Sequence, residues 1–429
     1  MEIELQVHHY KGDIIMDIKK YVEAEMPNLI AMRRHFHEYP EGSQKEFKTM
    51  DYIEAKLKDM GLSSVRVPQG GILATIDSGK PGYTMLMRAD IDALPVPEDA
   101  VNLSKPKVAV SKNEGYSHAC GHDGHIAMLL TEGKILAEHT DEWEGKVILM
   151  FEQAEEFGER GGKHLLQYIQ KQGLHVDTCY ATHVRWDIPV GKMTVLDDGV
   201  MSGAFFFRVK LNGKGGHGSR PDLSINPIDA FIAFGAALQS LRMRAVAPDH
   251  CLTYSFGALK AGQEPNIIPP ELTFAGSCRF FDNNDGEFFR EKFHQILDHV
   301  CEEYGVSSEM EEEQFLPVTM NDKTCAALAR NTIAKTLGED TLYPASHWMA
   351  SETFGAALAI YPGILAFTGI NDPEVGSGAN HHNAKFDIGE KGLATGVESS
   401  LAYVLAVLKD KPDFSDFKAA DLDEIIKRL

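Results

Sequence analysis

Residues 118–125 read His118-Ala119-Cys120-Gly121-His122-Asp123-Gly124-His125 and place three imidazoles, a thiol and a carboxylate in one short segment. Zinc and its transition-metal neighbours prefer imidazole and thiolate ligands, whereas calcium and magnesium prefer oxygen. The two glycines allow the tight turn that would let Cys120 and His122 face one point. A polar turn in which histidines coincide by chance is the alternative. The segment predicts part of a transition-metal centre whose other ligands lie elsewhere in the chain.

The size and charge of the chain narrow the classes of protein to consider. A chain of 429 residues is too long for one compact core and predicts two or three domains. The formal net charge of −21 argues against nucleic acid or an anionic membrane surface as a partner, because both require a basic face on the protein. Solubility alone is the simplest explanation of this charge.

The lack of an expected membrane or signal segment and the spacing of the cysteines favour a cytoplasmic location for the protein. No apolar stretch approaches the ~20 residues that span a bilayer, and residues 1–20 lack the apolar core of a secretory signal. The six cysteines are scattered without the spacing of a disulfide framework, as in a reducing compartment. We therefore expect a cytoplasmic protein.

The apolar pattern predicts an α/β fold. Helices are expected over residues 13–36, kinked or divided at Pro27, and over 48–60, 126–139, 324–337 and 391–408. Short continuous apolar runs at 71–76, 84–87, 146–151 and 363–367 are typical of buried strands.

A different pattern begins near Gly199. Strands are expected at 204–211, 252–259 and 272–281, with helices at 227–244 and 286–304. This order is that of a small α+β domain inserted into the larger one. The acidic stretch 309–313 is expected to be solvated surface near the second junction.

Three further places offer metal ligands or a general base. The pair Glu155-Glu156 follows the strand expected to end at Phe151, at the strand end where α/β sheets place their sites. A solvated acidic turn is the alternative reading of this pair. His183 is a second strand-end candidate, and the pair His381-His382 is the third place. Together with residues 118–125 these groups exceed the four ligands of a structural zinc site, which indicates an open and catalytic centre with one or two metal ions.

Several stretches resemble the M20 metallopeptidase family, in particular its aminoacylase, hippurate hydrolase and aminobenzoyl-glutamate hydrolase branch. They occur in order along the chain at Arg33–Glu41, Arg88–Pro95, His118–His125, Gln153–Glu156, Gly213–Gly218, Asn266–Pro269 and His381–Phe386. The resemblance implies a large zinc-peptidase-like α/β catalytic domain with an inserted, smaller α+β lid or dimerisation domain. The expected boundaries are 12–198 and 312–429 for the catalytic domain and 199–311 for the insertion.

The resemblance also implies a role for individual residues. The metal ligands would be Cys120, His122, Glu156, His183 and His382, with His382 chosen over His381 because it lies four residues before Phe386. Glu155 matches the general base, and Asp90 matches a carboxylate that supports the site. His217 and Asn266 of the inserted domain match residues that reach substrate or stabilise the oxyanion, often from a neighbouring subunit. Arg279 is a candidate for gripping a substrate carboxylate, because a guanidinium can bind one with two hydrogen bonds.

Three departures from the family pattern affect substrate specificity. Thr353 stands where the family commonly has an acidic residue, Phe205 also replaces an acidic residue, and Asp222 follows Pro221 where a histidine is frequent. None of the three replaces a metal ligand or the base.

These inferences together predict a metal-dependent amidohydrolase that cleaves N-acyl amino acids or related peptide-like carboxylates. Zinc is the first choice of metal, with manganese, cobalt or nickel as alternatives, and a homodimer or higher homo-oligomer is expected. A dipeptidase or carboxypeptidase is one alternative, and a non-catalytic, metal-dependent binding homologue is another. A nucleotide-binding enzyme is not supported, because the chain contains no phosphate-binding loop motif.

Overall fold

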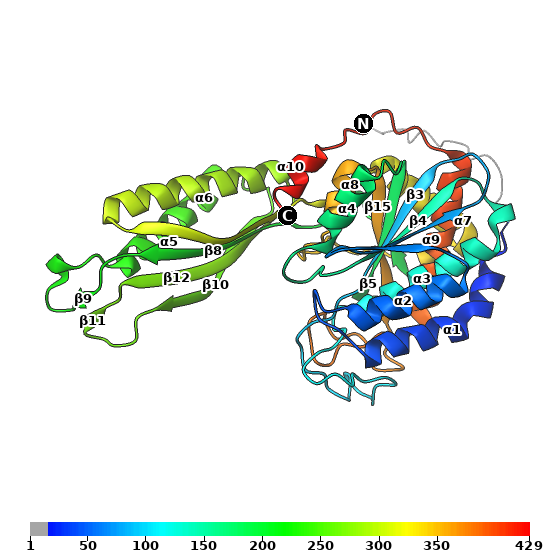
Figure 1. The fold of residues 1–429 in the computed structure, drawn as a ribbon, viewed down its shortest axis with the longest axis horizontal. Helices are drawn as coiled ribbons and strands as arrows, with labels where there is room; N and C mark the ends of the chain where they lie inside the picture. The colour runs from blue at the N-terminus through cyan, green and yellow to red at the C-terminus, as the bar shows by residue number, and fades with distance from the viewer. Residues whose placement is uncertain (1–15) are drawn as a thin grey trace. The chain divides into compact units, whose positions relative to one another are not determined.

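The structure is a computed structural model that describes residues 16–429. Residues 12–15, the first four of the predicted catalytic domain, lie outside the described residues, as does most of the N-terminal segment assessed as a signal. The chain divides into two compact units, coloured by residue number in Figure 1. The larger unit contains the described residues up to Asp198 together with 321–346 and 357–420, and the smaller contains 199–320, 347–356 and 421–429.

The larger unit is built on a seven-stranded sheet with the order β1-β2-β4-β3-β5-β15-β6. Strands β3, β4, β5 and β15 run parallel, while β1, β2 and β6 pair antiparallel at the two edges. The strands are β1 Ser64–Val67, β2 Gly71–Asp77, β3 Thr84–Asp90, β4 Lys146–Glu152, β5 Thr178–Pro189, β6 Met193–Thr194 and β15 Gly363–Asn371. Their nearly continuous apolar sequences suit a sheet covered on both faces, and the predicted α/β class is confirmed.

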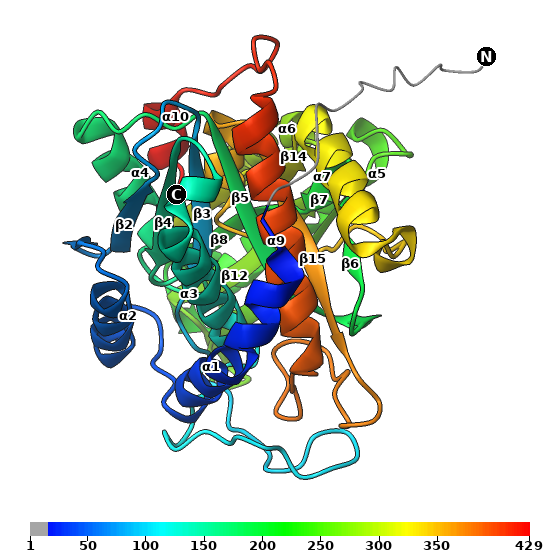
Figure 2. The ribbon, with the colours of Figure 1, turned by 90° about the vertical axis from the view of Figure 1, so that its right-hand side faces the viewer.

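Helices cover this sheet. Figure 2 shows α1, α3 and α9 side by side in front of the strands, and these helices contact one another. The helices of this unit are α1 Ile18–Glu38, α2 Phe47–Asp59, α3 His122–Glu138, α4 Gly161–Lys171, α7 Lys323–Leu337 and α9 Lys391–Asp410, and α8 Gly355–Ile360 crosses one junction.

Pro27 does not divide the helix, because α1 continues through this residue from Ile18 to Glu38. Proline removes one backbone donor, so the carbonyl of Glu23 loses its helical partner. Both Pro27 and Glu23 are exposed, so water can hydrate that carbonyl. The opposite face of α1, which includes Val22 and Leu29, is fully buried in the core and holds the helix in place.

The smaller unit is a four-stranded antiparallel sheet with two long helices on one face (Figure 1). Its order is β10-β12-β8-β13, with β8 Gly203–Asn212, β10 Leu252–Ala261, β12 Glu271–Phe280, β13 Ser307–Leu316, α5 Pro227–Ala245 and α6 Asn283–Tyr304. Its core is rich in phenylalanine, and Phe205 packs edge-on against Phe293 at 5.3 Å. The aromatic residue at position 205 therefore fills a hydrophobic core.

The described chain also contains short strands and one short helix. They are β7 Asp198–Met201 paired with β14 Thr319–Asn321, β9 Gly216–His217 paired with β11 Ile267–Ile268, and α10 Leu422–Ile426. No helix among residues 16–429 is long and apolar enough to cross a membrane.

The acidic stretch 309–313 is part of a strand, which the sequence analysis did not predict. It belongs to β13, whose pairing with β8 continues to Leu316, so the predicted boundary at residue 311 falls inside this strand. Acidic side chains are tolerated because β13 is an edge strand and is largely exposed. Charges on an edge strand also discourage pairing with other chains.

Candidate metal centre

The candidate ligands come from segments that meet at the carboxyl ends of the parallel strands. Asp90 ends β3, the turn 153–156 follows β4, and His382 follows β15. Open α/β sheets place their sites at this edge. His183 lies inside β5, which continues to Pro189, so the prediction that it ends a strand is wrong. The pairing of β5 with β3 stops at Ala181, however, and His183 lies just beyond it.

Helix α3 begins at His122, about one turn earlier than the sequence predicted. Gly121 precedes it with a φ of 90°, in the left-handed region that favours glycine. A Cβ atom on Gly121 would lie 2.3 Å from Cγ2 of Val184, the residue after His183. Glycine therefore allows α3 to approach β5 closely and brings His122 near His183.

Hydrogen bonds orient the rings of His122 and His183. His122 Nδ1 lies 2.8 Å from the carbonyl oxygen of Asp92 and 3.2 Å from its carboxylate. His183 Nδ1 lies 2.7 Å from the carbonyl oxygen of Val184. Because carbonyl oxygens only accept, both Nδ1 atoms donate, and each ring presents Nε2 as the possible metal ligand.

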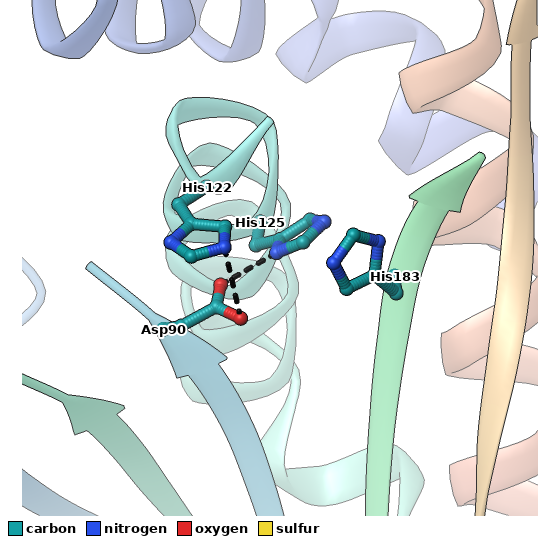
Figure 3. Close-up of side chains that lie close together, drawn as sticks. All are labelled: Asp90, His122, His125 and His183. Atoms are coloured by element: carbon teal, nitrogen blue, oxygen red, sulfur yellow. Dashed lines mark hydrogen bonds and ion pairs between the residues drawn. The ribbon is translucent and has the colours of Figure 1, made fainter. Parts of the chain in front are cut away.

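His125 lies close to the rings of His122 and His183 and is hydrogen-bonded to Asp90 (Figure 3). Both of its nitrogens are already engaged. Its Nδ1 lies 2.5 Å from Asp90 Oδ1, and its Nε2 accepts a hydrogen bond of 2.9 Å from the Val184 N–H. His125 therefore supports the centre and is not available as a ligand. Asp90 also accepts a hydrogen bond from Arg88 at 2.8 Å and lies 3.5 Å from His122 Nε2.

The remaining donor atoms gather around Glu156. Its Oε1 lies 3.2 Å from His382 Nε2 and 3.8 Å from His122 Nε2. Cys120 Sγ lies 3.7 Å from His183 Nε2, and the donor atoms of Cys120, His122 and Glu156 lie within 4.8 Å of one another. The five side chains expected to bind metal therefore lie together.

The two adjacent histidines face different partners. His382 adopts a left-handed φ of 58°, donates its backbone N–H to Ala119 at 2.8 Å, and is half exposed with its ring toward Glu156. His381 is buried, and its Nδ1 lies 3.1 Å from the Cys120 carbonyl oxygen. A strained backbone at a non-glycine residue is typical of functional sites.

The electrostatics of the donor set fit a bound cation. Burial and the neighbouring Glu156 raise the pKa of the Cys120 thiol well above its ordinary range. Burial lowers the pKa of His183, while Asp90 and other neighbours outweigh burial and raise that of His122. Among the described residues, the buried atoms His122 Nε2 and Glu156 Oε1 make no hydrogen bond. These residues fit a metal ion, because a divalent cation held by them would satisfy both atoms and stabilise the thiolate.

Glu155 precedes Glu156 in the same turn and is buried, with 8% of its surface exposed. The turn is held by Asp92, whose Oδ2 accepts the Glu156 N–H at 3.0 Å and the Ser43 hydroxyl at 2.6 Å. Asp92 was not among the residues expected to hold the site. Asp92 lies two residues after Asp90 in the stretch 88–95, which resembles the M20 family, and this position could have identified it.

The other candidate residues belong to the smaller unit, within which two of them are neighbours. His217 pairs with Ile267 in the β9–β11 ladder, and the carbonyl of Asn266 accepts the Gly218 N–H at 2.8 Å. Both His217 and Asn266 are exposed. Arg279 donates to the Ser351 hydroxyl at 2.5 Å and lies over the ring of Phe206, with its guanidinium carbon 4.7 Å from the ring centre.

Comparison with known proteins identifies the family. Residues 86–406 match the model of peptidase family M20/M25/M40. The chain is 31% identical over 366 residues to the N-acetyl-L-cysteine deacetylase of Bacillus subtilis, covering 85% of this chain and 84% of that protein. It is 30% identical over 405 residues to thermostable carboxypeptidase 1 of Saccharolobus solfataricus, covering 92% and 99%.

A solved structure supports the same assignment. The Bacillus subtilis protein YXEP, described as a dinuclear metal-binding peptidase of the M20 family, matches with a TM-score of 0.73 at 26% identity, covering 90% of this chain and 99% of that one. The resemblance seen in the sequence is therefore confirmed. The chain belongs to peptidase family M20/M25/M40 and is a hydrolytic enzyme that uses divalent metal ions, not a non-catalytic homologue.

Proposed function

We propose that this enzyme hydrolyses the amide bond of N-acyl amino acids or related peptide-like carboxylates. The observation that carries the proposal is the gathering of thiol, imidazole and carboxylate donors directly beside a second, buried carboxylate, Glu155. The name of the related N-acetyl-L-cysteine deacetylase supports an acylated amino acid as substrate.

We assign the metal ligands to the five donors described above, Cys120, His122, Glu156, His183 and His382. Zinc is the first candidate because thiolate and imidazole are its preferred ligands, with manganese, cobalt and nickel as alternatives. Five ligands can hold one or two ions. When bound, the metal would supply Lewis-acid chemistry, lowering the pKa of bound water towards about 7 and polarising the amide carbonyl.

Glu155 is proposed as the general base. Its carboxylate takes one proton from the attacking water and delivers it to the amide nitrogen as the C–N bond breaks, so that the amine leaves with the proton it needs. General acid–base catalysis of this kind contributes about 10²–10⁴-fold to the rate. Asp90 supports the centre by holding His125 and facing His122.

His217 is proposed to donate a hydrogen bond to the oxyanion. Its Nδ1 accepts the Ser219 N–H at 3.1 Å, so the neutral ring carries its hydrogen on Nε2 and presents a donor there. A donor of this kind is worth about 3 kcal/mol to the transition state. Asn266 is proposed to contact the substrate. Arg279 is proposed to bind the substrate carboxylate through two hydrogen bonds from its guanidinium.

A carboxypeptidase or dipeptidase is the second candidate, favoured by the similarity to a thermostable carboxypeptidase. The two activities differ in whether the substrate has an acyl group or a free α-amino group. The metal-free protein is loaded separately with zinc, manganese, cobalt or nickel and given N-acetyl amino acids and the dipeptides with the same C-terminal residue. We expect a higher kcat/KM for the N-acetyl compounds. Preference for dipeptides would favour the second candidate, and no hydrolysis with any metal would contradict both.

We further propose a homodimer formed through the smaller unit. Strand β10 is an edge of its sheet and has backbone groups available for pairing with another strand. Beside it, α5 and β10 line a groove of about 1000 Å³, and α5 exposes 62% of Ile232 and 71% of Met243. Exposed apolar side chains beside an unpaired edge are typical of protein interfaces.

We place the enzyme in the cytoplasm. All six cysteines are free thiols, and five of them are buried. Free thiols of this kind are typical of a reducing compartment.

A further inference from the structure

The turn that contains Glu155 has a strained backbone. Ala154, the residue before the proposed base, has a φ of 51°, in the left-handed region that side chains other than glycine rarely adopt. Such a conformation costs about 1–2 kcal/mol and persists only where surrounding contacts enforce it.

Glu46 supplies such contacts from a distant part of the chain. Its Oε1 accepts the backbone N–H of Ala154 at 2.8 Å, and its Oε2 accepts the side-chain amide of Gln153 at 2.9 Å. The Glu46 side chain is fully buried. Both of its oxygens are therefore used to hold the two residues that precede Glu155.

Capping of α2 does not explain why the carboxylate of Glu46 is buried here. Glu46 stands at the N-cap position of α2, yet its side chain makes no capping hydrogen bond to that helix. Burial and the neighbouring Asp92 raise the pKa of Glu46 to about 7, which shows that keeping a carboxylate here is costly. An aspartate, asparagine or serine at this position would cap α2 more effectively.

The turn is held on both sides of Glu155. Glu46 binds the N–H of Ala154 before it, and Asp92 binds the N–H of Glu156 after it at 3.0 Å. Two carboxylates from different segments thus fix the backbone on either side of the proposed base. General bases lose efficiency steeply when their position shifts, and a displacement of about 1 Å can cost ~10²-fold in rate.

We propose that Glu46 is a positioning residue for Glu155, holding the strained turn in the conformation that aims the base. The proposal rests on the proposed function, in which Glu155 moves the proton. It requires no contact between Glu46 and the substrate or the metal.

The test compares four variants of the full-length, metal-loaded enzyme: Glu46→Ala, Glu46→Gln, Glu41→Ala and Glu155→Gln. Glu41 is the matched control, because its Oε2 binds the N–H and hydroxyl of Thr49 in the first turn of α2 at 2.8 and 2.9 Å. Removing it therefore perturbs the same helix through a different contact. Metal content, kcat and KM are measured for each variant.

We expect Glu46→Ala to lower kcat by about 10–100-fold with KM and metal content within about twofold of wild type. Glu46→Gln should fall between wild type and Glu46→Ala, because one amide oxygen can still accept the Ala154 N–H. Glu41→Ala should leave kcat unchanged. Should Glu46→Ala fail to fold, a reduced kcat in Glu46→Gln supports the proposal.

Two results overturn the inference. One is a wild-type kcat in Glu46→Ala, or in Glu46→Gln where the alanine variant does not fold. The other is an equal loss of kcat in Glu41→Ala, which would show a general effect of α2. If instead Glu155→Gln remains fully active, the assignment of the base itself is wrong, so the two failures are distinguishable.

Discussion

At the scale of single residues, the metal centre depends on which nitrogen of each histidine is used. His122 and His183 donate from Nδ1 to carbonyl oxygens and turn Nε2 towards the other donors, whereas His125 uses both nitrogens in hydrogen bonds. The sequence places His122 and His125 in one short segment and His183 in a separate one, and the family resemblance implies that His122 and His183 are ligands. The division of the three histidines into proposed ligands and supports follows from bonds to Asp90, Asp92 and Val184, which only the folded structure brings near.

Replacing Cys120 with alanine should weaken metal binding, because it removes the thiolate from the donor set. We expect affinity to fall at least ~10-fold, as is typical when groups at a metal site are lost. Metal per chain is measured after dialysis against a competing chelator. Cys179→Ala is the control, since Cys179 is a buried thiol that donates to the Tyr361 carbonyl. Equal metal retention in the two variants would remove Cys120 from the ligands.

Glu132 provides a residue-scale prediction about pH. Burial raises the pKa of Glu132 to about 8, from about 4.5 in the unfolded chain, and Ser400 opposes this shift only in part. The folded protein therefore keeps a proton that the unfolded chain loses, and stability falls as pH rises from about 4.5 to about 8. At about 1.4 kcal/mol per pKa unit, the loss is on the order of 4 kcal/mol.

Glu132→Gln should abolish this loss, because the amide has no proton to release. Urea unfolding at pH 5 and pH 8 measures the effect, and the variant should lose less stability across this interval than wild type does. Identical pH dependence in the two proteins would show that Glu132 does not titrate as described.

At the scale of secondary structure, the sequence predicted the buried strands well. It did not predict elements whose conformation depends on their place in the folded structure. The buried strands β2, β3, β4 and β15 all begin at the predicted residue, because continuous apolar runs have few alternatives. Strands β2 and β4 also end within one residue of the prediction, whereas β3 and β15 continue beyond it, to Asp90 and Asn371. Strand β13 was missed, since an exposed edge can carry the acids of residues 309–313. The uninterrupted α1 was missed because the exposure of Pro27 could not be foreseen from spacing alone.

Gly121→Ala tests the close approach of α3 to β5. We expect a loss of at least ~2 kcal/mol in the free energy of unfolding, because the left-handed φ and the contact with Val184 both disfavour a Cβ atom. Gly61→Ala is the control, since Gly61 has a φ of 75° but no atom within 4 Å of its Cβ position. It should cost about 1 kcal/mol. Equal costs would mean that the approach to Val184 contributes nothing.

At the scale of the whole molecule, the proposed catalytic groups are divided between the two compact units. The larger unit contains the candidate ligands and Glu155, while His217, Asn266 and Arg279 belong to the smaller one. The strand and helix order of the sequence predicts an inserted domain over 199–311, and the smaller compact unit includes 199–320. The strand β13 at this junction has no signal in the sequence, because its acidic residues resemble those of a loop.

The proposed dimer predicts the effect of charges on α5. Ile232→Glu combined with Met243→Glu should convert the dimer into a monomer, because these exposed apolar side chains line the groove beside β10. Light scattering coupled to size-exclusion chromatography measures the mass. Met320→Glu, at another exposed apolar position of the same unit, should leave the dimer intact. A wild-type monomer, or a double variant that remains dimeric, would contradict the proposed interface.

The central claim is that Glu155 is the base of a metal-dependent hydrolase while its neighbour Glu156 is a ligand. Glu155→Gln tests it most directly when metal content and kcat are measured on the same sample. We predict wild-type metal content with kcat lowered at least ~10²-fold, because the amide cannot accept the proton of the attacking water. Near-normal turnover, or loss of the metal along with the activity, would contradict the account.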